Sequence, residues 1–105
     1  MKGDDVMAIV YVAHAYDGDK YKYQRAKRIT HELQEHDIAD CFLCPVLMFS
    51  HMGGDLTDEN TMELRLDVLS ICDKMIVASH MDAAVQTEVD FANLVGMEVE
   101  WIEED

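Results

Sequence analysis

The chain has 105 residues, half of them apolar, and carries 8 Lys and Arg against 22 Asp and Glu, which gives a formal net charge of −14. This length supports one domain over residues 1–105 with a single layered core, and the composition excludes a disordered chain. The acidic balance argues against a nucleic-acid polymer or an anionic membrane as partner, because phosphate groups are bound by clustered Lys and Arg.

The three cysteines, Cys41, Cys44 and Cys72, come with no signal peptide and no long apolar run, a pattern that predicts a reduced, cytoplasmic protein. Cys41 and Cys44 have CxxC spacing but lie in an apolar, strand-like run, so we interpret them as buried thiols. A zinc site that adds His51 is the alternative, and it is disfavoured because the second ligand pair lacks motif spacing. We therefore expect no metal and no other cofactor.

The first half of the chain begins with a nearly continuous apolar run over Val6–Ala13, which predicts a central parallel strand buried on both faces. A polar loop, residues 14–19, follows it. Tyr21–Glu35 then has helical periodicity. Its expected inward stripe comprises Ala26, Ile29 and Leu33.

The middle of the chain predicts a second strand over Ile38–Leu43, ended by Pro45. Residues 46–55 mix large apolar side chains with a Gly pair, and we expect them to form a loop that folds over a pocket. Thr57 or Asp58 is expected to cap a helix that runs to about residue 71. Its expected inward side chains are Met62, Leu66 and Leu69.

The last third predicts a buried third strand over Met75–Ala78, then a helix over Ala83–Leu94 with Asp82 as its N-cap. Gly96 suits the position just after that helix. Residues 97–103 alternate between apolar and acidic side chains, as in a half-exposed edge strand whose glutamates discourage edge-to-edge pairing.

The order βαβαβαβ with right-handed crossovers predicts a three-layer α/β fold with a parallel four-stranded sheet of order 2-1-3-4. The winding reverses between strands one and three, where ligands of open α/β sheets bind. Three segments meet there: the loop after Ala13, the loop after Pro45, and the corner from His80 to Glu88.

Side chains at this corner have two readings each. Glu88 lies at the edge of an apolar helical stripe, either half-buried beside a cavity or as an ordinary boundary residue. His14 and His80 lie on crevice loops, where they either contact a base or phosphate or serve the structure. Five of the eight basic residues fall within positions 20–28, which form either a solvated helix face or, with the helix's first amides, a phosphate site.

Three motifs resemble the nucleoside 2-deoxyribosyltransferase-like superfamily, in particular its short, mostly uncharacterised bacterial and phage members. They are Tyr11-Val-Ala-His-Ala-Tyr-Asp-Gly18, Glu63-Leu-Arg-Leu-Asp67 followed by Asp73, and Ala84-Val-Gln-Thr-Glu88-Val-Asp-Phe-Ala92. Their order and approximate spacing match the superfamily across nearly the whole chain.

The resemblance implies a flavodoxin-like, Rossmann-like fold, a homodimer or higher homo-oligomer, and a small-molecule nucleoside or nucleotide as partner. It implies cleavage or exchange of the N-glycosidic bond of a nucleoside or its 5′-monophosphate. Glu88 matches the nucleophile, Asp67 an acid near the sugar or base, and Tyr11 a pocket residue that orients Glu88. A carboxylate at that place traps the oxocarbenium-like centre, and a second acid protonates the leaving base. The expected substrate contacts are His14, Tyr16, Gly18, Phe49, His80, Asp82 and Ala84.

The chain also departs from the superfamily pattern. Ala84 replaces a Gly, Ala15 replaces a Pro, and an Asp-Gly-Thr turn is missing. These changes restrict how closely the backbone can approach the sugar. They support an alternative function, a non-catalytic module that binds a nucleotide ligand as a sensor or sponge. A flavin mononucleotide carrier is a weaker reading, because residues 14–19 are poor in the Ser, Thr and Gly of a phosphate loop.

Overall fold

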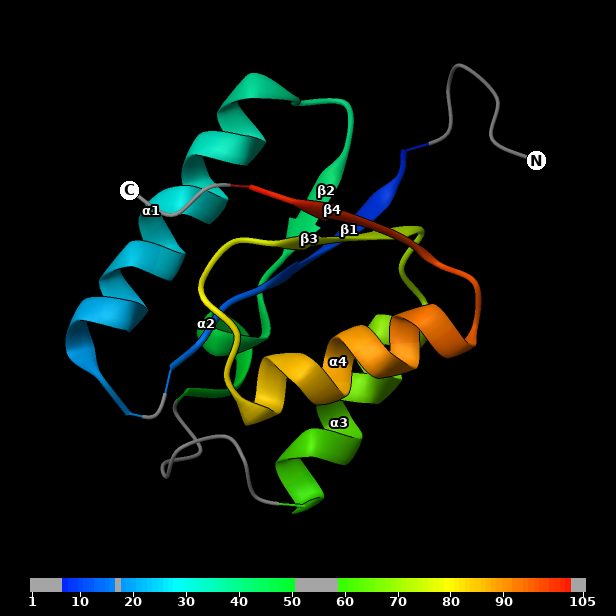
Figure 1. Ribbon diagram of the computed structural model, residues 1–105. Coiled ribbons are helices and arrows are strands. Elements are labelled where there is room, and N and C mark those ends of the chain that lie inside the picture. Colours follow the sequence, from blue (N-terminus) through cyan, green and yellow to red (C-terminus); the bar gives the residue numbers. More distant parts are fainter. Residues whose placement is uncertain (1–6, 17, 51–58, 103–105) are drawn as a thin grey trace.

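The computed structural model describes residues 7–16, 18–50 and 59–102. Its centre is a sheet of four parallel strands in the order β2-β1-β3-β4. The predicted three-layer α/β class and strand order are therefore confirmed (Figure 1). The strands are β1 (Ile9–Ala13), β2 (Cys41–Leu43), β3 (Lys74–Val77) and β4 (Glu98–Trp101).

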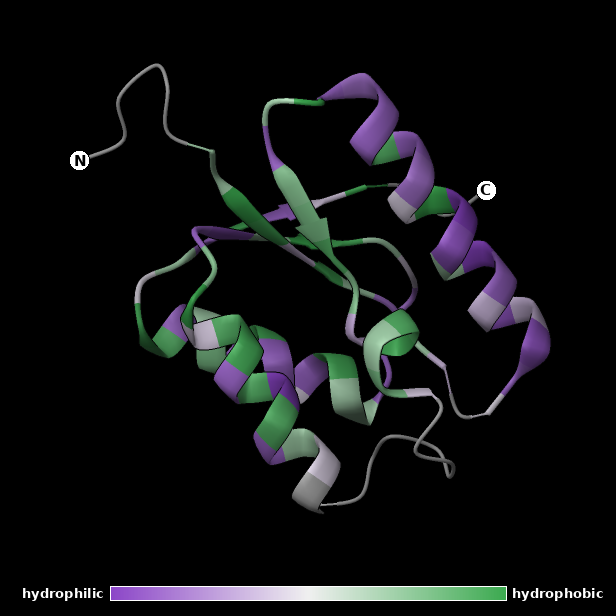
Figure 2. Ribbon diagram, turned by 180° about the vertical axis from the view of Figure 1, so that it is seen from behind, coloured by the Kyte–Doolittle hydropathy of each residue, from purple (hydrophilic) through white to green (hydrophobic). Residues whose placement is uncertain are grey.

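Helices pack on both faces of the sheet. α1 (Lys20–His36) and α2 (Pro45–Phe49) cover one face, and α3 (Glu59–Ser70) and α4 (Ala83–Leu94) cover the other (Figure 1). Each pair encloses its own hydrophobic cluster against the strands. In Figure 2, α1 is hydrophilic along most of its length, as expected for a helix that buries only a narrow stripe, whereas the strands β1 and β2 are mostly hydrophobic.

The central strand β1 is buried on both faces, as its apolar sequence predicts. Because side chains alternate along a strand, Tyr11 and Ala13 join the α3 and α4 cluster, while Val12 joins the α1 and α2 cluster. His14, just past the strand, contacts Arg25 of α1. The side chains of Tyr11 and His14 therefore lie on opposite sides of the sheet.

Local capping explains where the helices begin and end. Asp82 caps α4 by accepting a hydrogen bond from the Val85 amide at 2.8 Å, as predicted. At the other end, Gly96 has φ +77°, and the Met97 amide donates to the Ala92 carbonyl at 2.8 Å. Together with the bond from the Gly96 amide to Asn93, this is a Schellman motif.

Three predicted element bounds are wrong. The first strand, predicted from Val6, begins at Ile9. β2 begins at Cys41 rather than at Ile38, which is 86% exposed in a turn where the Asp40 amide donates to the Asp37 carbonyl. The expected loop after Pro45 begins as the helix α2, because a proline that cannot continue a strand is well suited to the first position of a helix. Residues 51–58, which include both predicted caps of α3, lie outside the described residues.

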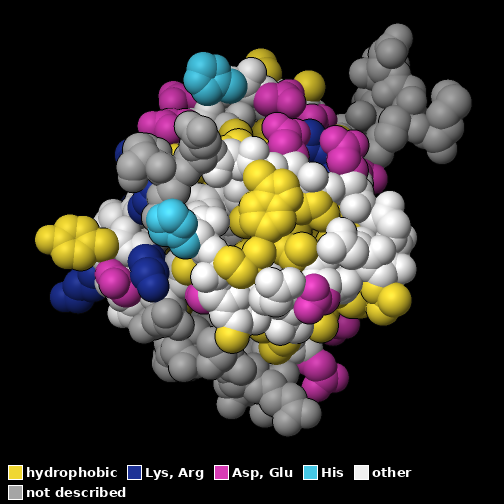
Figure 3. All heavy atoms as spheres, viewed as in Figure 1, with side chains coloured by type: hydrophobic (Ala, Val, Ile, Leu, Met, Phe, Trp, Pro, Cys, Tyr) yellow, Lys and Arg dark blue, Asp and Glu magenta, His cyan; other side chains and the backbone are white. Residues whose placement is uncertain are grey.

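β4 is an edge strand, as predicted, but it is more exposed than its alternating sequence suggests: only Val99 is partly buried, and Trp101 is 55% exposed. Figure 3 shows apolar side chains gathered on this face of the molecule. Within the described ranges, none of the helices has the length and apolar character needed to cross a membrane.

The Gly96 turn generates the first prediction. No atom lies within 4 Å of a Cβ built at Gly96, so Gly96→Ala should introduce backbone strain without a clash. We expect it to lower the free energy of unfolding by about 1–2 kcal/mol, measured by urea denaturation. Asn93→Ala, on the exposed surface of α4, is the control and should change stability by less than about 0.5 kcal/mol. Equal losses for both variants would contradict this account of the turn.

The Cys72 thiol generates a second prediction. Burial, followed by the nearby charge of Asp73, raises its pKa to about 11 from the ordinary value of 9.0. The folded chain therefore holds the thiol proton more tightly than the unfolded chain does, so this contribution is complete below pH 9 and is lost as the pH rises toward 11. Urea unfolding at several pH values across this range, under reducing conditions, should show a steeper alkaline loss for the wild type than for Cys72→Ala.

Candidate functional site

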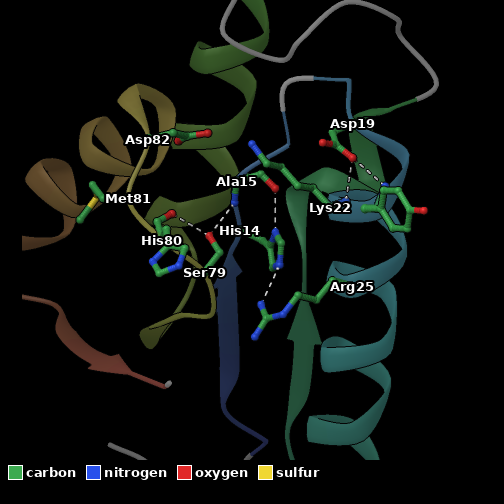
Figure 4. Close-up of a pocket in the computed structure, with 10 residues that line it drawn as sticks. His14, Ala15, Asp19, Lys22, Arg25, Ser79, His80, Met81 and Asp82 are labelled. Atoms are coloured by element: carbon green, nitrogen blue, oxygen red, sulfur yellow. Dashed lines mark hydrogen bonds between the residues drawn. The ribbon is translucent and has the colours of Figure 1, made fainter. Parts of the chain in front are cut away.

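A pocket of about 380 Å³ lies at the carboxyl ends of β1 and β3, where the sheet order predicts a ligand crevice (Figure 4). The loops after the two strands are joined there, because the Ala15 amide donates to the Ser79 hydroxyl at 2.8 Å. The first turns of α1 close the other side. The pocket is lined by His14, Ala15, Asp19, Tyr21, Lys22, Arg25, Ser79, His80, Met81 and Asp82.

His14 is held at the base of this pocket by two contacts. Its Nδ1 lies 2.7 Å from the Ala15 carbonyl, and its Nε2 lies 3.0 Å from a terminal nitrogen of Arg25 (Figure 4). A guanidinium only donates, so Nε2 is the acceptor, and Nδ1 donates its proton to the carbonyl. Arg25 also donates to the Ala78 carbonyl, which fixes the guanidinium between the two strand ends.

The helix N-termini at the pocket are already satisfied by acidic caps. Asp19 accepts hydrogen bonds from the amides of Tyr21 and Lys22 at 2.7 and 3.3 Å. Asp82 does the same for the Val85 amide of α4. An anion in the pocket is therefore met by the side chains of Lys22 and Arg25 rather than by these amides.

Glu88 belongs to a different place, a fully buried cluster between the sheet and α3 and α4. The Tyr11 hydroxyl donates to Glu88 Oε2. Arg65 Nε donates to the same oxygen at 3.1 Å, and Arg65 Nη2 lies 2.8 Å from Oε1. The Arg65 and Glu88 side chains are 2% and 0% exposed. Oε2 thus accepts both hydrogen bonds, whereas Oε1 pairs with the charge of Arg65 but accepts no hydrogen bond from the described residues.

The cluster shifts the pKa of each of its members. Burial raises the pKa of the Glu88 carboxyl, and the Arg65 guanidinium opposes this rise. Burial and the Glu88 charge together raise the pKa of Tyr11 well above its ordinary value, so its hydroxyl keeps its proton and donates. Burial tends to lower the pKa of Arg65, but Glu88 and Tyr11 together outweigh this effect and the net direction is upward. Arg65 is therefore a permanent cation in the core.

The structure divides the predicted site residues into groups. His14, His80 and Asp82 line the pocket together. Tyr11 and Glu88 meet in the buried cluster, across the sheet from His14. The others lie apart: Tyr16 packs against Tyr23, Gly18 is exposed before α1 with φ +74°, Phe49 packs in the α1 and α2 cluster, Asp67 is exposed on α3, and Ala84 is buried on α4.

Arg65 is the residue that sequence reasoning missed. It lies three residues after Met62 and four before Leu69, which places it on the inward stripe of α3. A single charged residue at an inward position of a helix indicates a buried ion pair. The partner of Arg65 in this ion pair is Glu88, which the sequence places at the edge of an apolar helical stripe.

The zinc alternative requires Cys41, Cys44 and His51, of which His51 lies outside the described residues. Among the residues that are described, no three or more His, Cys, Asp and Glu side chains gather closely enough to hold a metal ion. Cys44 is buried, as predicted for a core thiol, and Cys41 is partly exposed.

A scan against models of protein families finds no match to this chain, and a search of curated proteins finds none either. The superfamily resemblance, the homo-oligomer and the cytoplasmic location therefore stay predictions.

The buried cluster generates a third prediction. Arg65→Met should lower the free energy of unfolding by about 3–5 kcal/mol, because it leaves the Glu88 carboxylate buried without its cation. Arg65→Met combined with Glu88→Gln should lose less, since the amide oxygen still accepts from Tyr11 and no charge remains. Urea denaturation measures both.

The pH dependence of these variants checks the cause. An unpaired buried Glu88 has a folded pKa above its unfolded value, so the single variant should regain stability as the pH falls from 7 toward 5. The double variant should show no such gain. A double variant as unstable as the single one, with the same pH dependence, would contradict the ion-pair account.

Proposed function

We propose that this chain is a binding module for a nucleoside 5′-monophosphate, held in the pocket between the β1 and β3 loops, and that it does not cleave its ligand. One observation carries the proposal: Lys22 and Arg25 line the pocket, while the carboxylate that cleavage requires is enclosed on the other side of the sheet. The two carboxylates that also line the pocket, Asp19 and Asp82, are engaged as helix caps.

The pocket supports a ligand of this class. Its volume of about 380 Å³ falls within the range of small-molecule sites. Lys22 and Arg25, three residues apart on α1, both line it and supply positive charge for a phosphate. His80 and Met81 line it from the β3 side. The nucleoside part of the proposal rests on the superfamily resemblance of the three motifs.

The state of Glu88 supports binding without turnover. Attack on the anomeric carbon requires a carboxylate oxygen that can touch the sugar. Glu88 exposes none of its surface, Arg65 and Tyr11 donate hydrogen bonds to its Oε2, and its Oε1 lies 2.8 Å from Arg65 Nη2. A sensor or sponge for a nucleotide ligand fits this arrangement.

Cleavage or exchange of the N-glycosidic bond is the second candidate, and one observation favours it. The Tyr11 hydroxyl donates to Glu88, which is the contact expected of a residue that orients a carboxylate nucleophile. For this candidate, Glu88 is the nucleophile and must exchange its contact with Arg65 for one with the substrate.

The binding proposal predicts the outcome of calorimetry with nucleosides and nucleoside 5′-monophosphates of the common bases. At least one monophosphate should bind more tightly than its nucleoside. Lys22→Ala should weaken its binding about tenfold or more, the loss of about 1.4 kcal/mol expected for one phosphate contact. Lys27→Ala removes the same charge from an exposed site of α1 outside the pocket and should leave binding unchanged.

Chromatography of long incubations then separates the two candidates. Under the binding proposal, no free base appears with the wild type. Free base that appears with the wild type and not with Glu88→Gln would establish the glycosidase instead, and transfer to a second added base would make it a transferase. A panel in which no monophosphate binds and none is consumed would contradict both candidates.

A further inference from the structure

The outer face of α1 differs in charge from the rest of the molecule. Residues 20–31 contain five of the eight Lys and Arg and none of the 22 Asp and Glu, so the remaining chain carries three basic residues against 22 acidic ones. In Figure 3, most of the basic side chains visible on this face lie along its left edge, where α1 begins, and acidic side chains spread over the rest. Positive charge is therefore concentrated on α1.

This basic helix face continues directly from the pocket. An open hollow of about 480 Å³ is lined by Tyr21, Gln24, Arg25 and Arg28. Tyr21 and Arg25 line both this hollow and the pocket, so the two share a wall. The four residues follow the spacing i, i+3, i+4, i+7, which places them in one row along the helix surface.

Each end of this row offers a different contact. Tyr21 is 88% exposed, although aromatic rings are usually covered, and an exposed ring is a platform on which a base can stack. Arg28 makes a 3.7 Å ion pair with Glu32, and both side chains are about half exposed. Exposed pairs of this kind are weak, so a phosphate with its two-oxygen geometry can displace Glu32 from the guanidinium.

We propose that the ligand of this chain contains two nucleosides joined through phosphate, a dinucleotide, and that the row from Tyr21 to Arg28 holds its second half. This inference rests on the proposed function, because the first nucleotide occupies the pocket. The linking phosphate lies against Arg25 and Arg28, and the second base stacks on Tyr21.

The charge distribution limits the ligand to this size. Outside residues 20–31 the chain has three basic and 22 acidic residues, and Arg65 and Glu88 among them are buried, so a longer strand that leaves the row meets an acidic surface that repels each further phosphate. A free dinucleotide and the end of a longer strand share the same chemistry, and the experiment below separates them.

The test compares four ligands by calorimetry on the intact chain. For the base that binds best in the panel above, they are the monophosphate, the diphosphate, the 5′-phosphorylated linear dinucleotide and a strand of about eight nucleotides. The dinucleotide should bind at least about tenfold more tightly than the monophosphate and more tightly than the diphosphate.

Variants of surface residues then show which side chains give the dinucleotide its higher affinity. Arg28→Gln should remove most of the advantage of the dinucleotide while leaving the affinity for the monophosphate unchanged, because Arg28 lines the hollow and not the pocket. Tyr21→Ala changes the wall that the two share, so it should weaken the dinucleotide more than it weakens the monophosphate. Lys27→Gln is the matched control, because it removes the same charge one position away and lines neither the pocket nor this hollow. All three changes lie on the side chains of an exposed helix face, and circular dichroism should show an unchanged fold.

The remaining outcomes each overturn the inference. Equal affinities for monophosphate and dinucleotide would leave the binding module in place and remove the second half of the site. A diphosphate that binds as tightly as the dinucleotide would show that no second base is held. An eight-nucleotide strand that binds more tightly than the dinucleotide would indicate a strand-binding protein. Failure of every ligand, the monophosphate included, would overturn the proposed function itself.

Discussion

The buried contact of Arg65 with Glu88 constrains much of this molecule. It joins α3 to α4, and through the Tyr11 hydroxyl it joins both helices to the central strand. A buried charge is costly unless an opposite charge lies beside it, so this contact favours one arrangement of the three elements. An apolar contact at the same place would tolerate sliding of the helices, whereas this one fixes their positions relative to β1.

The sequence motifs place Glu88, Tyr11 and His14 at one site, but the structure separates a buried stabilising cluster from a ligand pocket. The cluster secures one face of the sheet, while the pocket opens at the strand ends toward α1, with His14 and Arg25 at its base. Because side chains alternate along β1, Tyr11 belongs to the buried cluster, whereas His14, three residues later, lines the pocket. The acidic caps Asp19 and Asp82 complete the separation, since they satisfy helix amides and leave anion binding to side chains.

Much of the fold follows from local patterns. Continuous apolar runs predict β1 and β3, the period of Val85, Val89 and Ala92 predicts the buried stripe of α4, and Asp82 and Gly96 predict its ends. Pro45 misleads, because the same residue that ends a strand begins a helix. The partner of Glu88 could not be derived from local pattern, since Arg65 lies 23 residues away on another helix and only the packing of α3 against α4 brings them together. Tyr21 was likewise hidden, because periodicity does not reveal which exposed side chains border a pocket.

The order of strands in the sheet also has a consequence for biosynthesis. β1 is made early, yet one of its two neighbours is β3, and the Ile9 amide finds its acceptor in Asp73, 64 residues later. Until β3 has emerged from the ribosome, the edge of β1 that pairs with β3 remains unpaired. Ser79, whose hydroxyl joins the two pocket loops, has not yet been synthesised at that stage. Native contacts of such long sequence separation form slowly. Nascent chains that stop before β3 therefore have an aggregation-prone unpaired strand and no ligand site. Capture on an immobilised ligand would select chains that have been synthesised past this point.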